Sequence, residues 1–238
     1  MDPIEDFITR YVESRQVVLD IGANQGLYTR TILARGARVY AFEPNPEMAQ
    51  TLSRNLRNRR LEVVQKAVAD RSGTIEFHVD LRPGVGAVAS SVHQLDDLQG
   101  LTKRIAVECT TVDAFCGERK IRPQFIKVDV EGGERAVFAG ARETIARNAP
   151  FMVFEFWETW WRRGIADIFE QLAPGYDLVV LETGEDACAL YLAEGDSGRR
   201  AGSVDIGCIP KSKAARPMRG WKGWILGQWR RRGINQAV

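Results

Sequence analysis

The stretch Val17-Val18-Leu19-Asp20-Ile21-Gly22-Ala23-Asn24-Gln25-Gly26 decides the fold. Its first five residues are mostly apolar, which is typical of a strand buried on both faces of a parallel sheet. Gly22 and Gly26 allow a sharp turn and a close approach of the backbone to a ligand. A helix pattern begins at Tyr28, so unpaired N–H groups lie just beyond the turn. We therefore expect a strand, turn and helix that bind a nucleotide-type ligand.

A second strand, residues 38–43, ends in Glu43, which follows Gly22 by 21 residues. Nucleotide-binding folds place an acid at this distance to hold ribose hydroxyls. The turn is one residue shorter between its end glycines than G-x-G-x-x-G, and G-x-x-x-x-G-K-[ST] is absent. A ribose acid without a pyrophosphate turn favours an adenosine ligand without phosphates, of which S-adenosylmethionine is the common example. An NAD-like ligand and a plain tight turn with a surface Glu remain open.

Composition indicates one large globular domain with a basic tail. The chain has 238 residues, of which 45% are hydrophobic and 27% charged, ordinary values for a globular protein. Residues 199–238 contain ten Lys or Arg and one acid, Asp205. We expect a catalytic domain over residues 1–210 and a basic, Trp-rich tail over 211–238.

Targeting signals are not evident. The beginning of the chain is acidic and lacks the basic and apolar regions of a signal peptide, and no apolar stretch approaches the ~20 residues of a membrane span. The cysteines are scattered without a C-x-x-C pair: Cys109, Cys116, Cys188 and Cys208. We expect a cytoplasmic chain whose tail contacts the inner face of the membrane. A solvated or oligomer-contacting tail, and nucleic-acid binding by it, are the alternatives.

The alternation of elements predicts a doubly wound α/β sheet with an antiparallel insertion. Strands are expected at 17–21, 38–43, 61–66, 124–130, 151–156, 176–181 and 203–209, and helices at 5–16, 28–35, 46–58, 134–148 and 161–172. Residues 74–79 and 104–111 alternate like antiparallel strands. The polar segment between them is where a substrate loop would lie.

A second informative stretch is Lys127-Val-Asp129-Val-Glu131-Gly-Gly-Glu134. Charges within an apolar strand are costly unless they are paired or used. Ligands of open α/β sheets bind beyond the carboxyl ends of the strands, so these acids are expected beside the glycine turn. They could bind a divalent cation, or one could act as a base. Alternatively, Lys127 neutralises Asp129 and Glu134 caps the next helix.

Together these motifs resemble the FkbM family of methyltransferases, in order and spacing, over about residues 15–156. The resemblance is carried by residues 20–26, Phe42-Glu-Pro-Asn-Pro46, Thr111-Val-Asp113 and Ile126-Lys-Val-Asp-Val-Glu-Gly-Gly-Glu134. It implies a class I methyltransferase fold, Rossmann-like, with seven strands of which one is antiparallel. It also implies S-adenosylmethionine as cofactor and O-methylation of a hydroxyl of a sugar, glycan or natural product.

The resemblance also assigns residues. Cofactor binding falls to Asp20, Gly22, Asn24, Gly26, Glu43, Val68 and Asp129. Of these, the turn residues surround the methionine part, Glu43 holds the ribose, Val68 lines the adenine, and Asp129 faces the amino group or the transfer site. Ser90-Ser91 matches a Ser-rich spot in the variable region, and nothing is carried over beyond about residue 210.

For catalysis we expect a base that takes the proton of the acceptor hydroxyl. The candidates are Asp129, Glu131 and His93, with Glu155 as a competitor and His78 in packing. Whether a metal assists is open. Three tryptophans could stack on a sugar or merely pack: Trp157, Trp160 and Trp161. The alternative functions are methylation of nitrogen or another acceptor, and a non-catalytic cofactor-binding module.

Overall fold

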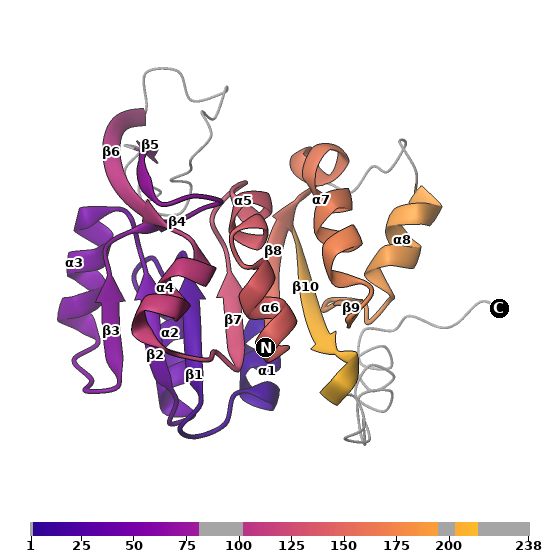
Figure 1. Ribbon diagram of the computed structural model, residues 1–238, viewed down its shortest axis with the longest axis horizontal. Helices are drawn as coiled ribbons and strands as arrows, with labels where there is room; N and C mark the ends of the chain where they lie inside the picture. The colour runs from indigo at the N-terminus through magenta and orange to yellow at the C-terminus, as the bar shows by residue number, and fades with distance from the viewer. Residues whose placement is uncertain (1, 81–101, 195–202, 214–238) are drawn as a thin grey trace.

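Figure 1 shows the computed structural model, which describes residues 2–80, 102–194 and 203–213. The strands of its main sheet are β1 (Val17–Ile21), β2 (Arg38–Phe42), β3 (Leu61–Val64), β7 (Phe125–Val128), β8 (Phe151–Trp157), β9 (Tyr176–Val180) and β10 (Ser203–Pro210). They lie in the order β3-β2-β1-β7-β8-β10-β9. Of these seven strands, β10 alone runs opposite to the other six. The predicted doubly wound, mostly parallel seven-stranded sheet is confirmed, and its order reverses between β1 and β7.

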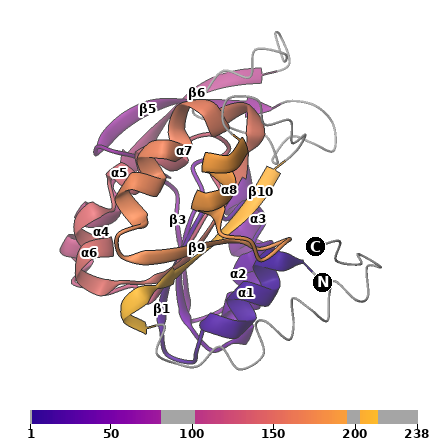
Figure 2. The ribbon, with the colours of Figure 1, turned by 90° about the vertical axis from the view of Figure 1, so that its right-hand side faces the viewer.

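Helices cover both faces of the sheet, which Figure 2 shows nearly edge-on. One face packs against α1 (Pro3–Tyr11), α2 (Leu27–Ala34) and α3 (Pro46–Asn55), and the other against α4 (Val112–Arg119), α5 (Glu134–Ala139), α6 (Arg142–Asn148), α7 (Glu158–Leu172) and α8 (Ala187–Glu194). Among the described residues, no helix has the length and apolarity needed to cross a membrane.

The strand β1 is buried on both faces, as its apolar run predicts. Val18 points into the layer of α1–α3, whereas Leu19 and Ile21 point into the layer of α4–α8. All three side chains are buried. Because β1 is central, the turn that follows it emerges in the middle of the sheet edge, where loops from both halves meet.

The insertion forms a second, smaller sheet above the carboxyl ends of the parallel strands (Figure 1). It contains β4 (Ala67–Val68), β5 (Gly73–Asp80) and β6 (Thr102–Thr110), in the order β4-β6-β5. The expected antiparallel pair is confirmed, with Asp80 opposite Thr102 at the end where residues 81–101 connect the two strands. The two-residue β4 is too short to give a period in sequence.

Several expectations about helices were wrong. The lead-in helix expected at 5–16 begins at Pro3 and ends at Tyr11. The single helix predicted over 134–148 is two helices, because Gly140 passes so close to β4 that a Cβ would lie 2.2 Å from the Ala69 carbonyl oxygen. The helix at 46–58 ends at Asn55, and α4 and α8 were missed. The caps of α4 and α6 explain the Thr111–Asp113 motif. Thr111 accepts a hydrogen bond from the Ala114 N–H, and the Asp113 carboxylate accepts two from the first turn of α6.

Candidate active site

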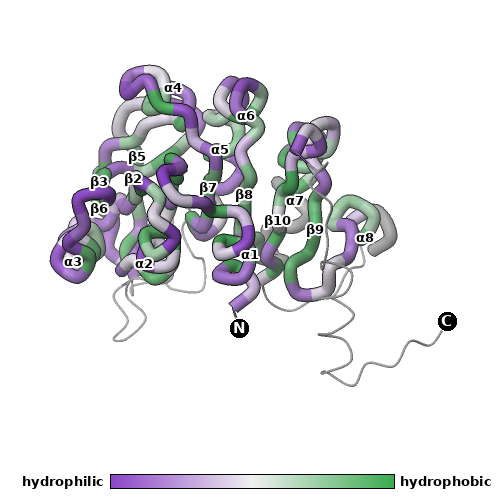
Figure 3. The backbone as a smooth tube through the Cα atoms, turned by 90° about the horizontal axis from the view of Figure 1, so that it is seen from below, coloured by the Kyte–Doolittle hydropathy of each residue, from purple (hydrophilic) through white to green (hydrophobic). Residues whose placement is uncertain are grey.

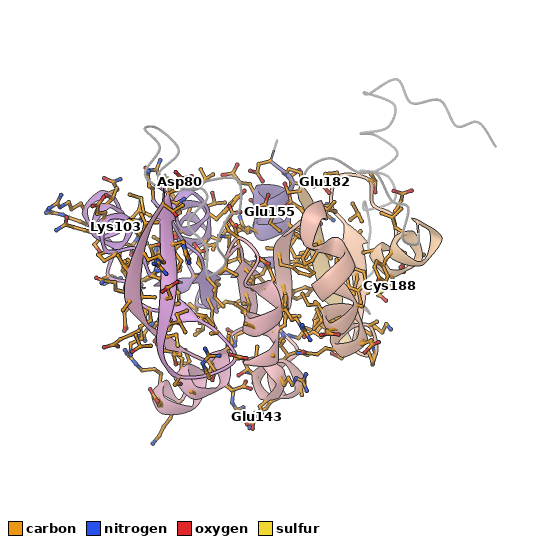
Figure 4. The ribbon with its side chains drawn as sticks, turned by 90° about the horizontal axis from the view of Figure 1, so that it is seen from above. Asp80, Lys103, Glu143, Glu155, Glu182 and Cys188 are labelled. Carbon is orange, nitrogen blue, oxygen red and sulfur yellow. The ribbon has the colours of Figure 1, made fainter. Side chains whose placement is uncertain are left out.

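A cavity of about 410 Å³ lies at the reversal of strand order, between the ends of β1, β2 and β7 and the small sheet. This volume is in the range of small-molecule sites. The predicted site residues among its walls are Gly22, Asn24, Glu43, Val68, Asp129 and Glu131. Figure 4 looks onto this edge of the molecule. A larger open groove, about 1760 Å³, runs along α5–α7 and includes neither the glycine turn nor Glu43.

The glycine turn is shaped by contact with β7. Gly22 has a φ of +77°, and a Cβ there would lie 1.7 Å from the Asp129 carbonyl oxygen. No other residue fits between these two backbones. Gly26, at φ +92°, begins α2 against the side chain of Leu52. The turn therefore presents its backbone to the cavity with no side chain in the way.

Glu43 follows β2 and is tied to the turn. Its Oε2 accepts a hydrogen bond from the Asn24 N–H at 2.8 Å, and its Oε1 accepts one from the Asn45 N–H at 2.9 Å. Burial raises the pKa of Glu43 to about 7, although these two bonds oppose the shift. A carboxylate oxygen can accept more than one hydrogen bond, so Glu43 retains acceptor capacity for two hydroxyl donors. A ribose supplies that pair.

The wall beside Glu43 is apolar. Phe42, Val68 and Phe77 face the cavity, together with Ala67 and Ala136. An adenine base needs such a flat apolar slot next to a ribose acceptor. The walls thus fit adenosine, and the backbone turn replaces the phosphate cradle that NAD-like ligands require.

Lys127 is buried beneath the site, where it lies between the carboxylates of Asp20 and Asp129. Its Nζ lies 3.3 Å from Asp20 Oδ1 and 3.3 Å from Asp129 Oδ2, and donates to the Gly22 carbonyl at 2.7 Å. Burial opposes its charge, but the carboxylates of Asp129 and Asp20 raise the pKa of Lys127 above its ordinary value. The predicted neutralisation of Asp129 by Lys127 is confirmed. Lys127 also joins β1, β7 and the glycine turn.

Three carboxylates gather beside this lysine. The side chains of Asp129, Glu131 and Glu155 each place an oxygen within 4.8 Å of the others. Burial, then the charges of Asp129 and Glu155, raise the pKa of Glu131 to about 8. Burial and the charge of Asp129 also raise the pKa of Glu155. Glu131 has a φ of +53°, and such backbone strain is concentrated at functional sites.

The comparisons with known proteins agree with this geometry. The FkbM methyltransferase domain matches residues 20–189. The chain belongs to this family. A crystal structure of an FkbM methyltransferase from Methylobacillus flagellatus superposes with a TM-score of 0.54 at 16% identity, covering 82% of this chain and 44% of that one. An rRNA methylase from Streptococcus thermophilus superposes with a TM-score of 0.51 at 9% identity, covering 88% and 97%. The fold is therefore that of the class I methyltransferases.

Two curated relatives are similar in sequence. The 2-O-methyltransferase NoeI of Sinorhizobium fredii is 31% identical over 145 residues, 56% of this chain and 60% of NoeI. The hexuronic acid methyltransferase AglP of Haloferax volcanii is 26% identical over 146 residues, 60% of this chain and 56% of AglP. The matches span a little over half the length of these relatives. Membership of the FkbM family implies that the chain uses S-adenosylmethionine.

The remaining predicted residues take other places. Asp20 is buried behind the turn, where it pairs with Lys127 and accepts a hydrogen bond from Thr29, and neither Asp20 nor Gly26 is among the cavity walls. The interpretation that Glu134 caps the next helix was wrong, because the N-cap of α5 is Gly133 and has no side-chain hydrogen bond. The Glu134 carboxylate instead accepts hydrogen bonds from the N–H groups of Val130 and Gly132, in the turn before the helix. The backbones of Trp157, Trp160 and Trp161 lie in β8 and α7. His93, Ser90, Ser91 and the three tryptophan side chains lie outside the described residues.

The structure adds residues that the sequence did not single out. Tyr28, on α2, lines the cavity. Lys127 Nζ lies 5.2 Å from the centroid of its ring, and the Tyr28 hydroxyl donates a hydrogen bond to Asp2 Oδ2 at 3.1 Å. Asp205 lies directly opposite Glu155 in the β8–β10 pair. Burial, then the charge of Glu182, raise the pKa of Asp205 to about 8. A row of carboxylates thus crosses β7, β8, β10 and the end of β9.

The signal that marks Glu155 as a candidate base is visible in the sequence. Like Asp129, it is a charge near the carboxyl end of an otherwise apolar strand. Asp205 carries a similar signal, because it is the one charged residue of the strand expected at 203–209. No comparable signal marks Tyr28, which reaches the site through tertiary packing.

Proposed function

We propose that the chain is an S-adenosylmethionine-dependent O-methyltransferase acting on a hydroxyl of a sugar, glycan or natural product. The observation that carries this proposal is the set of carboxylates at the ends of β7 and β8, which borders a cavity suited to adenosine. The names of the curated relatives, a 2-O-methyltransferase and a hexuronic acid methyltransferase, support a sugar acceptor.

The cofactor residues follow from the cavity. Glu43 would accept hydrogen bonds from the ribose hydroxyls, Val68 would pack on the adenine, and the backbone at Gly22 and Asn24 would surround the methionine part. Asp129 would receive the amino group. When bound, S-adenosylmethionine supplies a methyl group already activated by its sulfonium. Asp20 acts indirectly, because it holds Lys127 under the turn.

The acceptor side needs a base, because a sugar hydroxyl is a poor nucleophile near neutral pH. General-base assistance is typically worth about 10²–10⁴-fold, and works best when the pKa of the base is near the working pH. Glu131 meets this condition, since burial raises its pKa to about 8. Burial also raises the pKa of Glu155 above its ordinary value. Asp129 lies between them and Lys127 and orients the pair. His93 remains a proposed base in the variable segment.

The same carboxylates offer a second way to activate a hydroxyl. Oxygen ligands from Asp129, Glu131 and Glu155 suit a divalent cation such as Mg²⁺, which would act as a Lewis acid. Turnover that is lost in EDTA and restored by Mg²⁺ would assign the trio to a metal. Turnover that EDTA leaves unchanged would assign it to base catalysis.

Two further functions compete with O-methylation. Methylation of an amine acceptor would use the same cavity, and a non-catalytic partner subunit would bind the cofactor without turnover. The base candidates favour a hydroxyl acceptor. An uncharged amine is nucleophilic enough to react without losing a proton first, whereas a sugar hydroxyl is not.

The test combines binding and turnover. We expect S-adenosylhomocysteine to bind, and a panel of neutral, amino and acidic sugars to yield S-adenosylhomocysteine from S-adenosylmethionine with at least one acceptor. Glu131→Gln and Glu155→Gln should lower kcat by about 10²-fold or more with cofactor affinity nearly kept. Glu143→Gln, exposed on α6, is the matched control. Wild-type turnover in both site variants would remove the base hypothesis, and binding without turnover would favour the partner subunit.

We also propose how the chain is organised in the cell. Residues 1–210 would form the catalytic domain, and the tail 211–238 would rest on the inner face of the membrane. The tail's tryptophans and arginines support this placement. If truncation after Pro210 leaves cosedimentation with anionic vesicles unchanged, the tail has no such role.

A further inference from the structure

The edge of the sheet opposite the cavity carries a concentration of positive charge. β1, β2, β3 and β7 are parallel, so the loops that enter them share one edge. These loops, residues 12–16, 35–38, 56–61 and 119–124, contain nine basic residues and one acid, Glu13. The nine, which we call the basic edge, are Arg15, Arg35, Arg38, Arg57, Arg59, Arg60, Arg119, Lys120 and Arg122. All except Arg60 are exposed.

Backbone hydrogen bonds show that the basic edge is one continuous surface. The Arg15 N–H donates to the Gly36 carbonyl at 3.0 Å, and the Arg38 N–H donates to the Gln16 carbonyl at 2.8 Å. The Val39 N–H donates to the Arg60 carbonyl at 2.8 Å. Three of the four loops are therefore adjacent in space. Gln124 joins the fourth by donating its N–H to the Val17 carbonyl at 2.9 Å. Figure 3 views the molecule from this side.

Local structure explains only part of this charge. Arg35 and Lys120 stand at the C-termini of α2 and α4, where cations are favoured by the helix dipole. Arg119 pairs with Glu62 at 2.7 Å. Arg57 directly follows the C-cap of α3, so the same reason applies to it, whereas neither a helix end nor an ion pair among the described residues accounts for Arg59. Even with Glu62 and Glu118 at its margin, the surface has nine basic residues against three acidic ones.

The tail leaves the domain at the same edge. β10 runs antiparallel to β8, so it ends where the parallel strands begin. Beyond it, the Lys211 N–H donates to the Gly175 carbonyl at 2.9 Å, and Lys213 Nζ donates to the Asn148 carbonyl at 3.3 Å, in the loops that precede β9 and β8. Residues 214–238 contain six Lys or Arg, three Trp and no acid.

The opposite edge carries charges of both signs. Asp129, Glu131, Glu155, Glu182 and Asp205 surround or adjoin the cavity mouth, and the exposed Arg71, Lys103 and Arg104 lie on or beside the small sheet. A five-residue strand separates the two edges by about 17 Å. An anionic surface would attract the basic edge most strongly, which favours one orientation of the bound molecule.

We infer that the basic edge is a docking face for an anionic lipid bilayer, which holds the molecule with its cavity directed away from the lipid. Lys and Arg near an anionic leaflet add to membrane affinity, and tryptophan is enriched at the lipid–water interface. The described chain ends at this edge with Lys213, and the sequence that follows contains three Trp among six basic residues, which favours lipid over nucleic acid. This inference is independent of the methyl acceptor and extends the membrane contact from the tail to the folded domain.

The experiment measures cosedimentation of the full chain with vesicles of phosphatidylcholine, with and without phosphatidylserine. We expect binding only to the anionic vesicles. The triple variant Arg57→Glu, Arg59→Glu, Arg122→Glu should lower the partition coefficient by about 100-fold, since each basic residue near the surface contributes about fivefold. Its melting temperature should stay near that of the wild type, because these side chains are exposed.

The matched control carries the same charge change at the cavity end: Arg71→Glu, Lys103→Glu, Arg104→Glu. It should bind anionic vesicles like the wild type. An equal loss in both variants would mean that net charge alone attracts the chain, and would overturn the oriented face. Wild-type binding by the basic-edge variant would overturn it as well. Single-stranded RNA that displaces the chain from vesicles, and whose binding the basic-edge variant loses, would replace lipid with nucleic acid.

Discussion

Replacing Glu43 by Gln tests the cofactor assignment most directly. The glutamate has two oxygens, each with one backbone donor and room for a hydroxyl. Glutamine keeps one of these acceptors and loses the charge, and its NH₂ group would face either the Asn24 or the Asn45 N–H. A hydrogen bond to a charged group contributes about 1.5–3 kcal/mol. We therefore expect a loss of about 2 kcal/mol, or roughly 30-fold in the Kd for S-adenosylhomocysteine.

The pH dependence gives a second, sharper readout. Because the pKa of Glu43 is about 7 in the empty site, the carboxylate form is scarce at pH 6 and dominant at pH 8. Hydroxyl donors prefer the carboxylate, so wild-type affinity should rise about tenfold between these pH values. In Glu43→Gln this tenfold rise in affinity should disappear. Comparing the pH profile of the variant with that of the wild type removes the contribution of the ligand's own titrating groups.

Isothermal titration calorimetry from pH 6 to pH 8 measures both effects. Glu47→Gln, an exposed carboxylate four residues further along, should match the wild type throughout. If Glu43→Gln binds with unchanged affinity while remaining folded, Glu43 does not hold the ribose and the cavity was assigned incorrectly.

Three further predictions concern stability and the turn. Lys127→Met leaves Asp20 and Asp129 without their shared cation, so the free energy of unfolding in urea should fall by about 3–5 kcal/mol; a loss below 1 kcal/mol would contradict the central role of Lys127. Gly22→Ala should abolish cofactor binding, since its Cβ would lie 1.7 Å from a carbonyl oxygen, whereas Gly117→Ala, which meets nothing within 4 Å, should bind normally. Finally, the ordinary pKa of a glutamate is 4.5, but the pKa values of Glu43 and Glu131 in the folded state are about 7 and about 8. The folded state thus binds protons more tightly than the unfolded state, and this stability is complete below about pH 4.5 and lost as the pH rises through 7 and 8. The melting temperature of the ligand-free chain should fall between pH 5 and pH 8.5 in differential scanning calorimetry, and a rise over that range would contradict the assignment.

Features that depend on short stretches of chain were predictable from the sequence. The run that ends at Ile21, its glycine turn and Glu43 lie within one strand–helix–strand unit, so spacing alone places them together. Lys127 and Asp129 were recognisable because charge in a buried strand requires a partner, and two residues apart they face the same side.

Features that depend on strand order or close approach were not predictable in the same way. Glu155 meets Asp205 only because β10 inserts antiparallel between β8 and β9, which the alternation of elements does not reveal. The break at Gly140 depends on the position of the Ala69 carbonyl, about 70 residues earlier in the chain. Tyr28 is held at the site by a hydrogen bond from its hydroxyl to Asp2, the N-cap of α1, and this contact joins two helices that the sequence does not place together.

The pairing of Asp80 with Thr102 has a consequence for engineering. These two residues are direct partners at the end of the β5–β6 pair where the chain passes from one strand to the other, so the connecting residues 81–101 begin and end at a single pair of residues. A replacement segment has to match only that pair, and doubling its length costs only about 0.6 kcal/mol in closure entropy. The domain therefore offers an attachment point for exchanging segments between relatives, with the cofactor cavity and the main sheet left as they are.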